Sequence, residues 1–393
     1  MKIKIEHIPN TYNYGSLMMA VNTIVKLNDN IENIEFYVDA SSEEDLKRIK
    51  EETKLNNIYK ISNNSTSGNK ISRYIKKIQN EKKSYDSIIV LGGDDISEYY
   101  GKRLLLHELR RLYILRSMGI RIVLLGQTIG PFSGIRINIA KFVLNKMKIY
   151  TRDDNCLKYL QDIGIKSGVK GRDLAFLTLP NNCSNICNNY GLKENQYITI
   201  VPSGLYELYT KNYELYLEEQ IKIIRNIFSN SKLKHKKVVL LAHVLKPEHV
   251  DDRKVISDIW KLLSEEEKEK VVLINEELLA SEARGILSKG LFTITGRMHA
   301  AVSTFYERKP ALSLSYSVKY AGVIGKGLNR SDLIIESSGN EKWLNNNVSN
   351  LVSEKINYIL ENYETLIKEI DLEVGQTNKI VEEELLDLVN YLK

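Results

Sequence analysis

Short apolar runs alternate with amphipathic stretches along most of the chain. In the first half, runs of Ile, Val and Leu are often closed by glycine, which is typical of parallel strands buried on both faces. Stretches with helical spacing separate these runs, and Ser41 or Ser42, ahead of Glu44 and Asp45, resembles a helix start. Strands are expected at 2–8, 34–38, 86–92 and 121–126, and helices at 15–28, 43–52, 70–82 and 103–118.

The same alternation restarts after a polar, Asn-rich stretch at 181–195, which we interpret as a linker. The tail, 341–392, is rich in Glu, Leu, Ile and Lys and predicts two helices. Strands are expected at 197–203, 237–243, 270–274, 291–295 and 311–315, and helices at 213–228, 249–263, 276–288 and 298–307.

This order predicts an α/β protein with two doubly wound, Rossmann-like domains facing a cleft. The predicted boundaries are 1–180 for the first domain and 190–335 for the second, with helices at 340–393 packing back on the first domain. Ligands of such sheets bind beyond the carboxyl ends of the strands, so these junctions are where we expect the chemistry.

Composition narrows the class of protein. Of 393 residues, 43% are apolar and 27% charged, which excludes a disordered, collagenous or purely coiled-coil chain. The net charge of +6 suits anionic small substrates and does not indicate a nucleic-acid partner. Three cysteines with no metal-ligand spacing favour a reducing cytoplasm and no metal site. We see neither a signal peptide nor a membrane-spanning run.

The strongest chemical signal is the segment LFTITGRMHAAVSTF at 291–305. A strand ends at Thr295, Gly296 makes a tight exit, and a helix begins near Met298. Arg297 and His299 therefore lie at a helix N-terminus, where free N–H groups and the helix dipole favour an anion. An arginine adds bidentate recognition of carboxylate or phosphate. The alternative is a surface ion pair for Arg297 and a capping role for His299.

Two further strand ends carry polar side chains. Tyr316 and Lys319 follow the apolar run that ends at Ser315, and Lys319 could neutralise a second negative group. His243 ends another strand, ahead of an acidic pair, Asp251 and Asp252, at the next helix start. A solvated lysine and a histidine bonded to a loop carbonyl are the alternatives.

In the first half, glycine turns follow three strands: NYGS at 13–16, LGGDD at 91–95 and GQTIGPF at 126–132. Each lets a ligand approach the backbone. None fits the dinucleotide fingerprint, and neither a P-loop nor a nucleophile elbow is present. In YTRDD at 150–154, the carboxylate would cap a helix, with Arg152 either directed into the cleft or part of the cap only.

Taken together, these blocks resemble the polysaccharide pyruvyl transferases. The matching pieces run in order from about residue 7 to 330, and the last is the most specific because it combines Arg-x-His with Tyr-x-x-Lys. The matching pieces are NYGSL, VLGGDDIS, GQTIGPF, TRDDNCLKYLQDIGI, DLAFL and TGRMHAAVSTFYERKPALSLSYSVKYAGV.

The resemblance implies a fold similar to B-type glycosyltransferases, with phosphoenolpyruvate as donor. Two hydroxyls of a sugar become bridged by a pyruvate ketal, and no cofactor is needed besides phosphoenolpyruvate as co-substrate. The acceptor is a sugar in a glycan or in a lipid-linked precursor, and the latter would place a cytoplasmic enzyme at the inner face of the membrane. The resemblance assigns donor binding and catalysis to Arg297 and His299.

From this chemistry we expect Lys319, His243 and Tyr316 to join Arg297 and His299 around the donor. His299 is our candidate for the general acid, and Asp94, Asp95 and His243 are candidates for the general base. The acceptor-side candidates lie on first-domain loops: Asn13, Tyr14, Gly15, Gly92, Gly93, Asp94, Gln127 and Arg152.

Two other functions remain open at this stage. A glycosyltransferase that uses a nucleotide sugar could share the fold, and binding of phosphoenolpyruvate against nucleotide sugars would distinguish the two. The third possibility is a non-catalytic assembly partner in envelope synthesis. The joint presence of Arg297, His299 and Lys319 argues against it.

Overall fold

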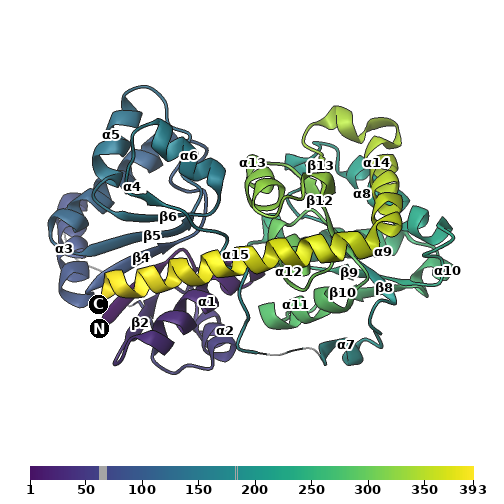
Figure 1. The fold of residues 1–393 in the computed structure, drawn as a ribbon, viewed down its shortest axis with the longest axis horizontal. Coiled ribbons are helices and arrows are strands. Elements are labelled where there is room, and N and C mark those ends of the chain that lie inside the picture. The colour runs from purple at the N-terminus through teal and green to yellow at the C-terminus, as the bar shows by residue number, and fades with distance from the viewer. Residues whose placement is uncertain (62–68, 182, 184) are drawn as a thin grey trace. The chain divides into compact units, whose positions relative to one another are not determined.

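The computed structural model describes residues 1–61, 69–181, 183 and 185–393, and it confirms the predicted α/β class (Figure 1). Contacts within the chain define two compact units. Unit 1 comprises Met1–Thr11, Ser16–Thr178 and Asn378–Lys393, and unit 2 comprises Tyr12–Gly15 and Leu179–Thr377.

The described part of unit 1 is built on a parallel sheet of seven strands in the order β3-β2-β1-β4-β5-β6-β7. The first strand of the chain pairs Ile3 with Phe36 on one side and with Ser87 on the other. The strands are β1 (Lys2–Glu6), β2 (Glu35–Val38), β3 (Ile58–Lys60), β4 (Ser87–Leu91), β5 (Arg121–Gln127), β6 (Lys148–Thr151) and β7 (Gly168–Val169). The helices are α1 (Tyr14–Asn30), α2 (Glu43–Thr53), α3 (Lys70–Ser84), α4 (Lys102–Ser117), α5 (Ile135–Leu144) and α6 (Asp154–Asp162).

Unit 2 repeats this plan with six described parallel strands in the order β10-β9-β8-β11-β12-β13. The strands are β8 (Tyr197–Val201), β9 (Lys237–Leu241), β10 (Val271–Ile274), β11 (Thr293–Thr295), β12 (Ala311–Ser315) and β13 (Ile334–Glu336). The helices are α7 (Ile186–Asn189), α8 (Tyr213–Ser229), α9 (Asp252–Leu262), α10 (Glu265–Lys268), α11 (Ala280–Lys289), α12 (Met298–Tyr306), α13 (Val318–Tyr320) and α14 (Asn347–Glu361), followed by α15 (Tyr363–Leu392). Short turns of other helix types lie at 206–208, 248–250, 321–326, 331–333 and 340–346.

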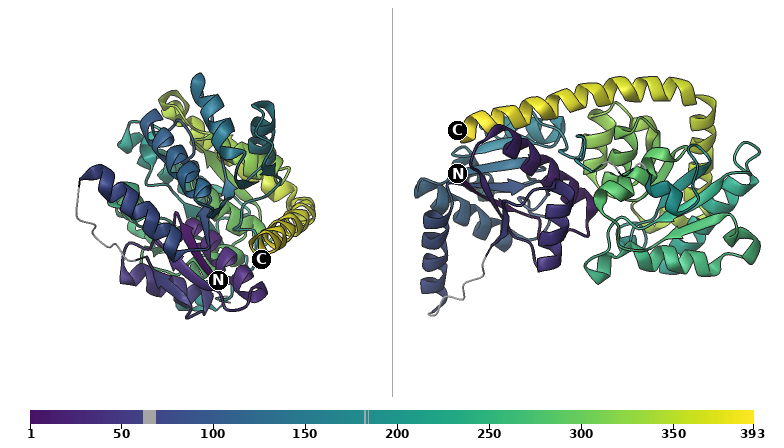
Figure 2. Two further views of the ribbon diagram at one scale, coloured as in Figure 1. Left: turned by 90° about the vertical axis from the view of Figure 1, so that its left-hand side faces the viewer. Right: turned by 90° about the horizontal axis from the view of Figure 1, so that it is seen from below.

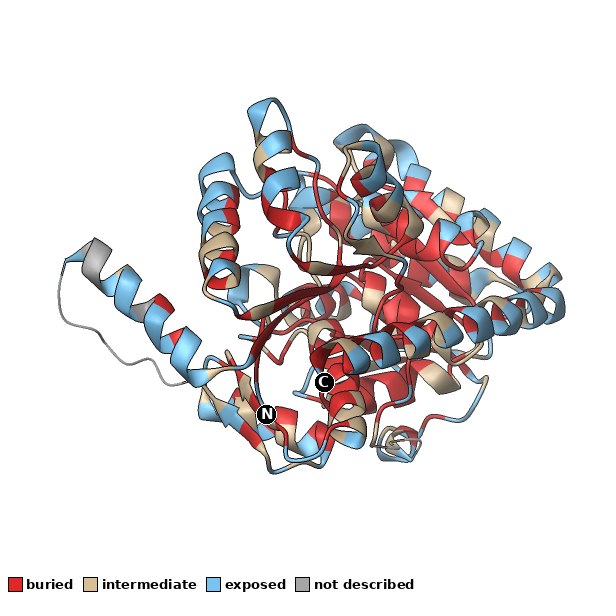
Figure 3. Ribbon diagram, turned by 60° about the vertical axis from the view of Figure 1, so that its left-hand side comes forward, coloured by how far each residue is buried: buried red, intermediate tan, exposed pale blue. Residues whose placement is uncertain are grey.

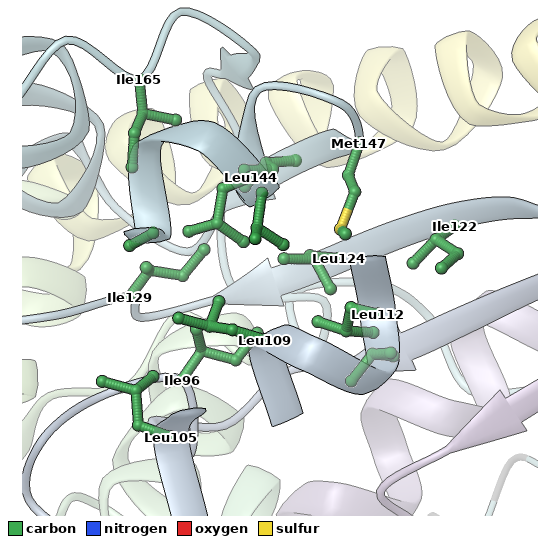
Figure 4. Packing of buried hydrophobic residues seen from close by; sticks show 14 of the residues in the cluster. Ile96, Leu105, Leu109, Leu112, Ile122, Leu124, Ile129, Leu144, Met147 and Ile165 are labelled. Carbon is green, nitrogen blue, oxygen red and sulfur yellow. The ribbon is translucent and has the colours of Figure 1, made fainter. Parts of the chain in front are cut away.

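The apolar runs fold into these sheets because helices cover both faces of each (Figure 2). Every residue of β4 and of β8 is buried, and in Figure 3 the buried residues, drawn in red, are concentrated in the interior, where the strands lie. In unit 1, the inner faces of α4 and α5 pack on the sheet through a cluster that includes Leu109, Leu112, Leu124 and Leu144 (Figure 4). Burial of this cluster positions the loops at the carboxyl ends of β4 and β5.

Several predicted elements agree closely with the structure, and others differ for local reasons. Ser42 caps α2 by accepting a hydrogen bond from the Asp45 N–H, and the two tail helices are present. The predicted helix at 276–288 begins only at Ala280. Three short strands (β3, β7 and β13) were not predicted, because two or three residues give too little hydrophobic pattern, whereas β6 confirms the strand expected to end in YTRDD.

The division of the chain also differs from the expected boundaries. It falls between Thr178 and Leu179, so the polar stretch 181–195 belongs to unit 2 and contains α7 (Asn182 and Ser184 lie outside the described residues). The tail is not confined to one unit: α14 and α15 up to Thr377 belong to unit 2, and only 378–393 belong to unit 1.

Candidate active site

The candidate site is built on the exit from β11 into α12 in unit 2. Arg297 is the N-cap residue of α12, and its N–H donates to the Thr295 hydroxyl at 2.8 Å. A Cβ on Gly296 would lie 2.8 Å from the Tyr209 hydroxyl, so only glycine fits this turn. The turn holds the backbone for a helix that begins at Met298, as predicted, with Arg297 and His299 at its N-terminus.

The guanidinium of Arg297 is held by a buried carboxylate. Its Nε and Nη2 donate to the Asp252 carboxylate at 3.0 and 2.6 Å, and Nη2 also donates to the Val250 carbonyl at 2.6 Å. Nη1 takes no part in these bonds. Of the two expected partners of Arg297, a ligand anion or a surface carboxylate, the structure shows a carboxylate, but a buried one: Asp252 occupies one face of the guanidinium. This contact outweighs the effect of burial, raises the pKa of Arg297 and keeps it charged.

Asp252 is the residue on which the surrounding loops converge. Its carboxylate is fully buried and accepts hydrogen bonds from the backbone N–H groups of Gly204, His243 and Val244 at 2.7, 3.1 and 2.8 Å, besides those from Arg297. These donors follow β8, β9 and β11. Sequence reasoning marked Asp252 only as part of an acidic helix start and missed this role.

The segment Tyr12–Gly15 packs in unit 2 against the loop after β9. Asn13 forms an antiparallel bridge with Val244, and the Tyr14 N–H donates to the His243 carbonyl at 3.3 Å. Asn13, Tyr14 and Gly15 therefore belong to unit 2 and not to the first domain as expected, while their role at the acceptor side stays a prediction. These backbone contacts join positions that are far apart in sequence, and no local pattern indicates them.

Gly15 lies directly against His299. A Cβ at Gly15 would fall 2.1 Å from Nδ1 and 2.6 Å from the Cβ of His299. Any larger residue at position 15 would therefore displace the imidazole. The glycine of NYGS is therefore required because His299 lies against it, whereas the sequence suggested only a turn that a ligand can approach.

His243 is buried next to Tyr14, the residue that precedes Gly15. It is 1% exposed, its ring meets the Tyr14 ring edge-on at 5.4 Å, and its Nε2 has no hydrogen-bond partner among the described residues. Burial, followed by the charges of His299 and Arg297, lowers the pKa of His243 well below its ordinary value. The imidazole is therefore neutral at pH 7 and can accept a proton or a hydrogen bond.

A cluster of tyrosines connects the loop after β12 to Gly296. The hydroxyls of Tyr209 and Tyr320 both donate to the Gly296 carbonyl at 2.7 Å, and the ring of Tyr316 packs edge-on against Tyr209 at 5.3 Å. Lys319 donates to the Tyr316 hydroxyl at 2.9 Å. Tyr316 and Lys319 are thus joined by contacts to the turn that carries Arg297, whereas Tyr209 was missed because it lies about 90 residues away in the chain.

In unit 1, several predicted acceptor-side residues contact one another and join the carboxyl ends of β4 and β5. A Cβ on Gly92 would meet the Gly126 carbonyl at 2.4 Å and Arg152 Nη2 at 2.9 Å, and Arg152 Nε donates to that same carbonyl. Gln127 is fully buried, and its Nε2 donates to the Leu91 carbonyl at 2.6 Å. These bonds brace the two strand ends, and the acceptor role expected of Gln127 and Arg152 stays a prediction.

Gly93, Asp94 and Asp95 lie on the loop that follows β4. Asp94 accepts a hydrogen bond from the Tyr100 hydroxyl at 2.7 Å, and the exposed Asp95 lies 3.3 Å from His7 Nδ1. The imidazole of His7 beside it lowers the pKa of Asp95. Gly93 stays on this loop, where its carbonyl accepts from the Thr128 N–H.

Within the described ranges, no group of three or more His, Cys, Asp or Glu side chains is arranged to hold a metal ion. In the same ranges, none of the helices combines the length and the apolar character that crossing a bilayer requires.

Comparisons with solved structures define the class of fold. Staphylococcus aureus MnaA in complex with UDP superposes with a TM-score of 0.62 over 99% of this chain and 95% of that one, at 13% identity. UDP-GlcNAc 2-epimerase from Neisseria meningitidis, bound to UDP-GlcNAc, gives 0.62 over 98% and 100%, at 14% identity. The protein therefore has the fold of B-type glycosyltransferases and these epimerases.

The sequence places the chain more narrowly within that class. Residues 13–318 match the family described as polysaccharide pyruvyl transferase, and the chain belongs to this family. The amylovoran biosynthesis protein AmsJ of Erwinia amylovora is 23% identical over 317 residues, which cover 78% of this chain and 73% of AmsJ. Both findings support a role in polysaccharide modification.

The first prediction concerns Asp252. Asp252→Asn keeps the size of the side chain but leaves the Arg297 charge without its partner, so unit 2 should lose about 3–5 kcal/mol of stability. Asp251→Asn is the matched control, because Asn is as good an N-cap residue as Asp and should cost less than about 1 kcal/mol. Urea unfolding of both variants checks this; equal losses would mean that Asp252 does not hold the loops.

The second prediction is a pH dependence set by His243. Because its pKa is lowered on folding, the unfolded chain takes up the proton first, and the stabilising contribution is present above pH 6.5 and lost as the pH falls. Between pH 7.5 and 5.5, His243→Gln should lose about 1.4 kcal/mol less stability than the wild type. His249→Gln, an exposed histidine, should behave like the wild type in the same denaturation series. A His243→Gln variant with unchanged pH dependence would contradict a neutral, buried His243.

Proposed function

We propose that the protein transfers the pyruvyl group of phosphoenolpyruvate to two hydroxyls of a sugar, forming a pyruvate ketal. The observation that carries this proposal is that Asp252 holds both the backbone of His243 and the guanidinium of Arg297, with His299 two residues further on at the N-terminus of α12. A donor with a phosphate and a carboxylate needs cationic anchors, and a ketal-forming reaction needs both a proton donor and a proton acceptor.

The donor would bind at the N-terminus of α12. Helix N–H groups, the remaining Nη1 of Arg297 and the ammonium of Lys319 supply the positive charge for its two anionic groups. At ~4 Å and an effective dielectric near 20, one such charge pair contributes on the order of 4 kcal/mol. Tyr316 holds Lys319 through its hydroxyl and so positions this second anchor.

The reaction balances with the residues of this group. His299 donates a proton to the methylene carbon of phosphoenolpyruvate, which leaves an oxocarbenium-like carbon at C2. One sugar hydroxyl attacks C2 and loses its proton, the C–O bond to phosphate breaks, and the second hydroxyl closes the ring as its proton leaves. Of the three candidate bases, His243 is favoured because its Nε2 has no hydrogen-bond partner among the described residues, whereas Asp94 already accepts a hydrogen bond from Tyr100 and Asp95 lies 3.3 Å from His7 Nδ1.

The acceptor would be a sugar of a glycan or of its lipid-linked precursor, bound by the unit 1 loops that carry Gly92, Gly93 and Asp94. Phosphoenolpyruvate enters as a co-substrate, so the proposed reaction requires no resident cofactor.

The third prediction tests the donor. Calorimetric titration of the purified protein with phosphoenolpyruvate should show binding, and titration with UDP- and GDP-sugars should not. In the presence of a matching glycan acceptor, phosphate release should accompany ketal formation. Binding of a nucleotide sugar in place of phosphoenolpyruvate would keep the fold and overturn the reaction in favour of glycosyl transfer.

The fourth prediction uses the contact between Gly15 and His299. His299→Ala should bind phosphoenolpyruvate within about tenfold of the wild type but lose turnover by at least about 100-fold, as expected for loss of a general acid. Gly15→Ala should lose turnover as well, because its methyl group displaces the imidazole.

Gly375→Ala is the matched control, since a Cβ there meets no heavy atom within 4 Å. Steady-state rates and phosphoenolpyruvate titrations of the three variants check this. Unchanged turnover in His299→Ala removes it as the proton donor, and unchanged turnover in Gly15→Ala removes the steric coupling.

A further inference from the structure

Helices α4 and α5 carry large apolar side chains on both their inner and their outer faces. Their inner faces carry Leu105, Leu109 and Leu112 from α4 and Leu144 from α5 into the core of unit 1 (Figure 4). Their outer faces also carry large apolar side chains, which is unusual for the solvent side of a helix in an α/β unit.

These outward apolar side chains form one continuous strip. Ile135, Ile139 and Phe142 follow helical spacing along α5, and Leu106 and Tyr113 do so along α4. Ile135, Phe142 and Leu106 are exposed, whereas Ile139 and Tyr113 are half-buried and also pack against the core cluster. The strips meet because the rings of Tyr113 and Phe142 lie 5.3 Å apart. Ile135 is 72% exposed and Phe142 56%. We refer to these five residues as the α4–α5 seam.

Positive charge surrounds the seam. Lys102 and Arg110 share the helical face of Leu106 on α4, and the Lys146 ammonium lies 4.8 Å from the centroid of the Phe142 ring. The stretches 99–118 and 131–146 hold eight Lys and Arg and one acidic residue, Glu108. That carboxylate is already paired with Arg111 at 2.7 Å.

The seam adjoins the loop that follows β4. Tyr99 and Tyr100 on this loop are 60% and 54% exposed. The loop is fixed to the start of α5, because Glu98 accepts from the Ser133 N–H and from Arg136 Nε, both at 2.6 Å. The Tyr100 hydroxyl donates to Asp94. Exposed aromatic rings, apolar side chains and lysines thus lie on neighbouring, mutually bonded segments.

We propose that the α4–α5 seam docks on the surface of a bilayer that contains anionic phospholipid. Apolar and aromatic side chains enter the boundary between headgroups and acyl chains, while flanking lysines and arginines bind lipid phosphates. A protein partner fits less well, because the cores of protein interfaces are depleted in lysine, and here lysines border the apolar strip on both helices.

The docking does not depend on the reaction proposed above. If that reaction is correct, the seam brings the loop with Asp94 and Tyr100 to the membrane surface. A sugar attached to a lipid carrier would then be the acceptor, and this consequence does rest on the proposed function.

The fifth prediction concerns co-sedimentation of the full chain with vesicles that contain no glycan and no phosphoenolpyruvate. Vesicles with phosphatidylglycerol should bind the protein, vesicles of pure phosphatidylcholine should bind it at least about tenfold more weakly, and added salt should weaken binding. Ile135→Ser with Phe142→Ser, and separately Lys102→Ala with Lys146→Ala, should each weaken binding about tenfold or more.

Two control variants distinguish binding through the α4–α5 seam from nonspecific binding by exposed apolar or basic residues elsewhere. Leu262→Ser removes a similarly exposed leucine on α9, and Lys232→Ala with Lys234→Ala removes two exposed lysines in unit 2. Both should bind like the wild type. The docking is overturned if the wild type ignores anionic vesicles, if the controls lose binding equally, or if the seam variants abolish a dimer seen by ultracentrifugation while no vesicle binding occurs. Because no donor is present, failure of phosphoenolpyruvate to bind leaves this result unaffected.

Discussion

The candidate site depends on one buried carboxylate. Asp252 accepts three backbone N–H groups and the Arg297 guanidinium, so the loops after β8, β9 and β11 meet at a single side chain. The pair does not act as a simple stabiliser, because removing two charges from water costs as much as their attraction returns. Its effect is one of register: with Asp252 in place, Arg297 and the start of α12 have a single position relative to His243.

The ion pair with Asp252 also limits how much of the Arg297 charge is left to bind a ligand. Asp252 neutralises much of the charge of Arg297, so an incoming anion would depend on the helix N-terminus, on Nη1 and on Lys319 together. The depressed pKa of His243 follows from the same arrangement, since burial and the nearby guanidinium of Arg297 both oppose a charge on its imidazole. A neutral histidine beside a cationic group is a consequence of how the loops are tied.

The sequence predicted the fold class because buried parallel strands must be apolar on both faces, as β4 and β8 are. It also placed Arg297 and His299 at a helix N-terminus, since Gly296 between an apolar run and a helical pattern is a local signal. The partners of these residues were not predictable. Asp252 and Tyr209 are about 45 and 90 residues from the β11 exit, and hydrogen bonds across such separations leave no period in the sequence.

Glycine illustrates the limit most clearly. Gly15, Gly92 and Gly130 all follow strands and all suggested open turns for a ligand, but each is required by a different neighbour: His299, the Gly126 carbonyl with Arg152, and the Tyr159 ring. Only Gly15 touches a catalytic candidate. Because it lies at the start of α1, whose later residues belong to unit 1, the position of His299 is coupled to a helix that the chain shares between its two units. A change in the packing of the first residues of α1 would therefore displace the proposed proton donor.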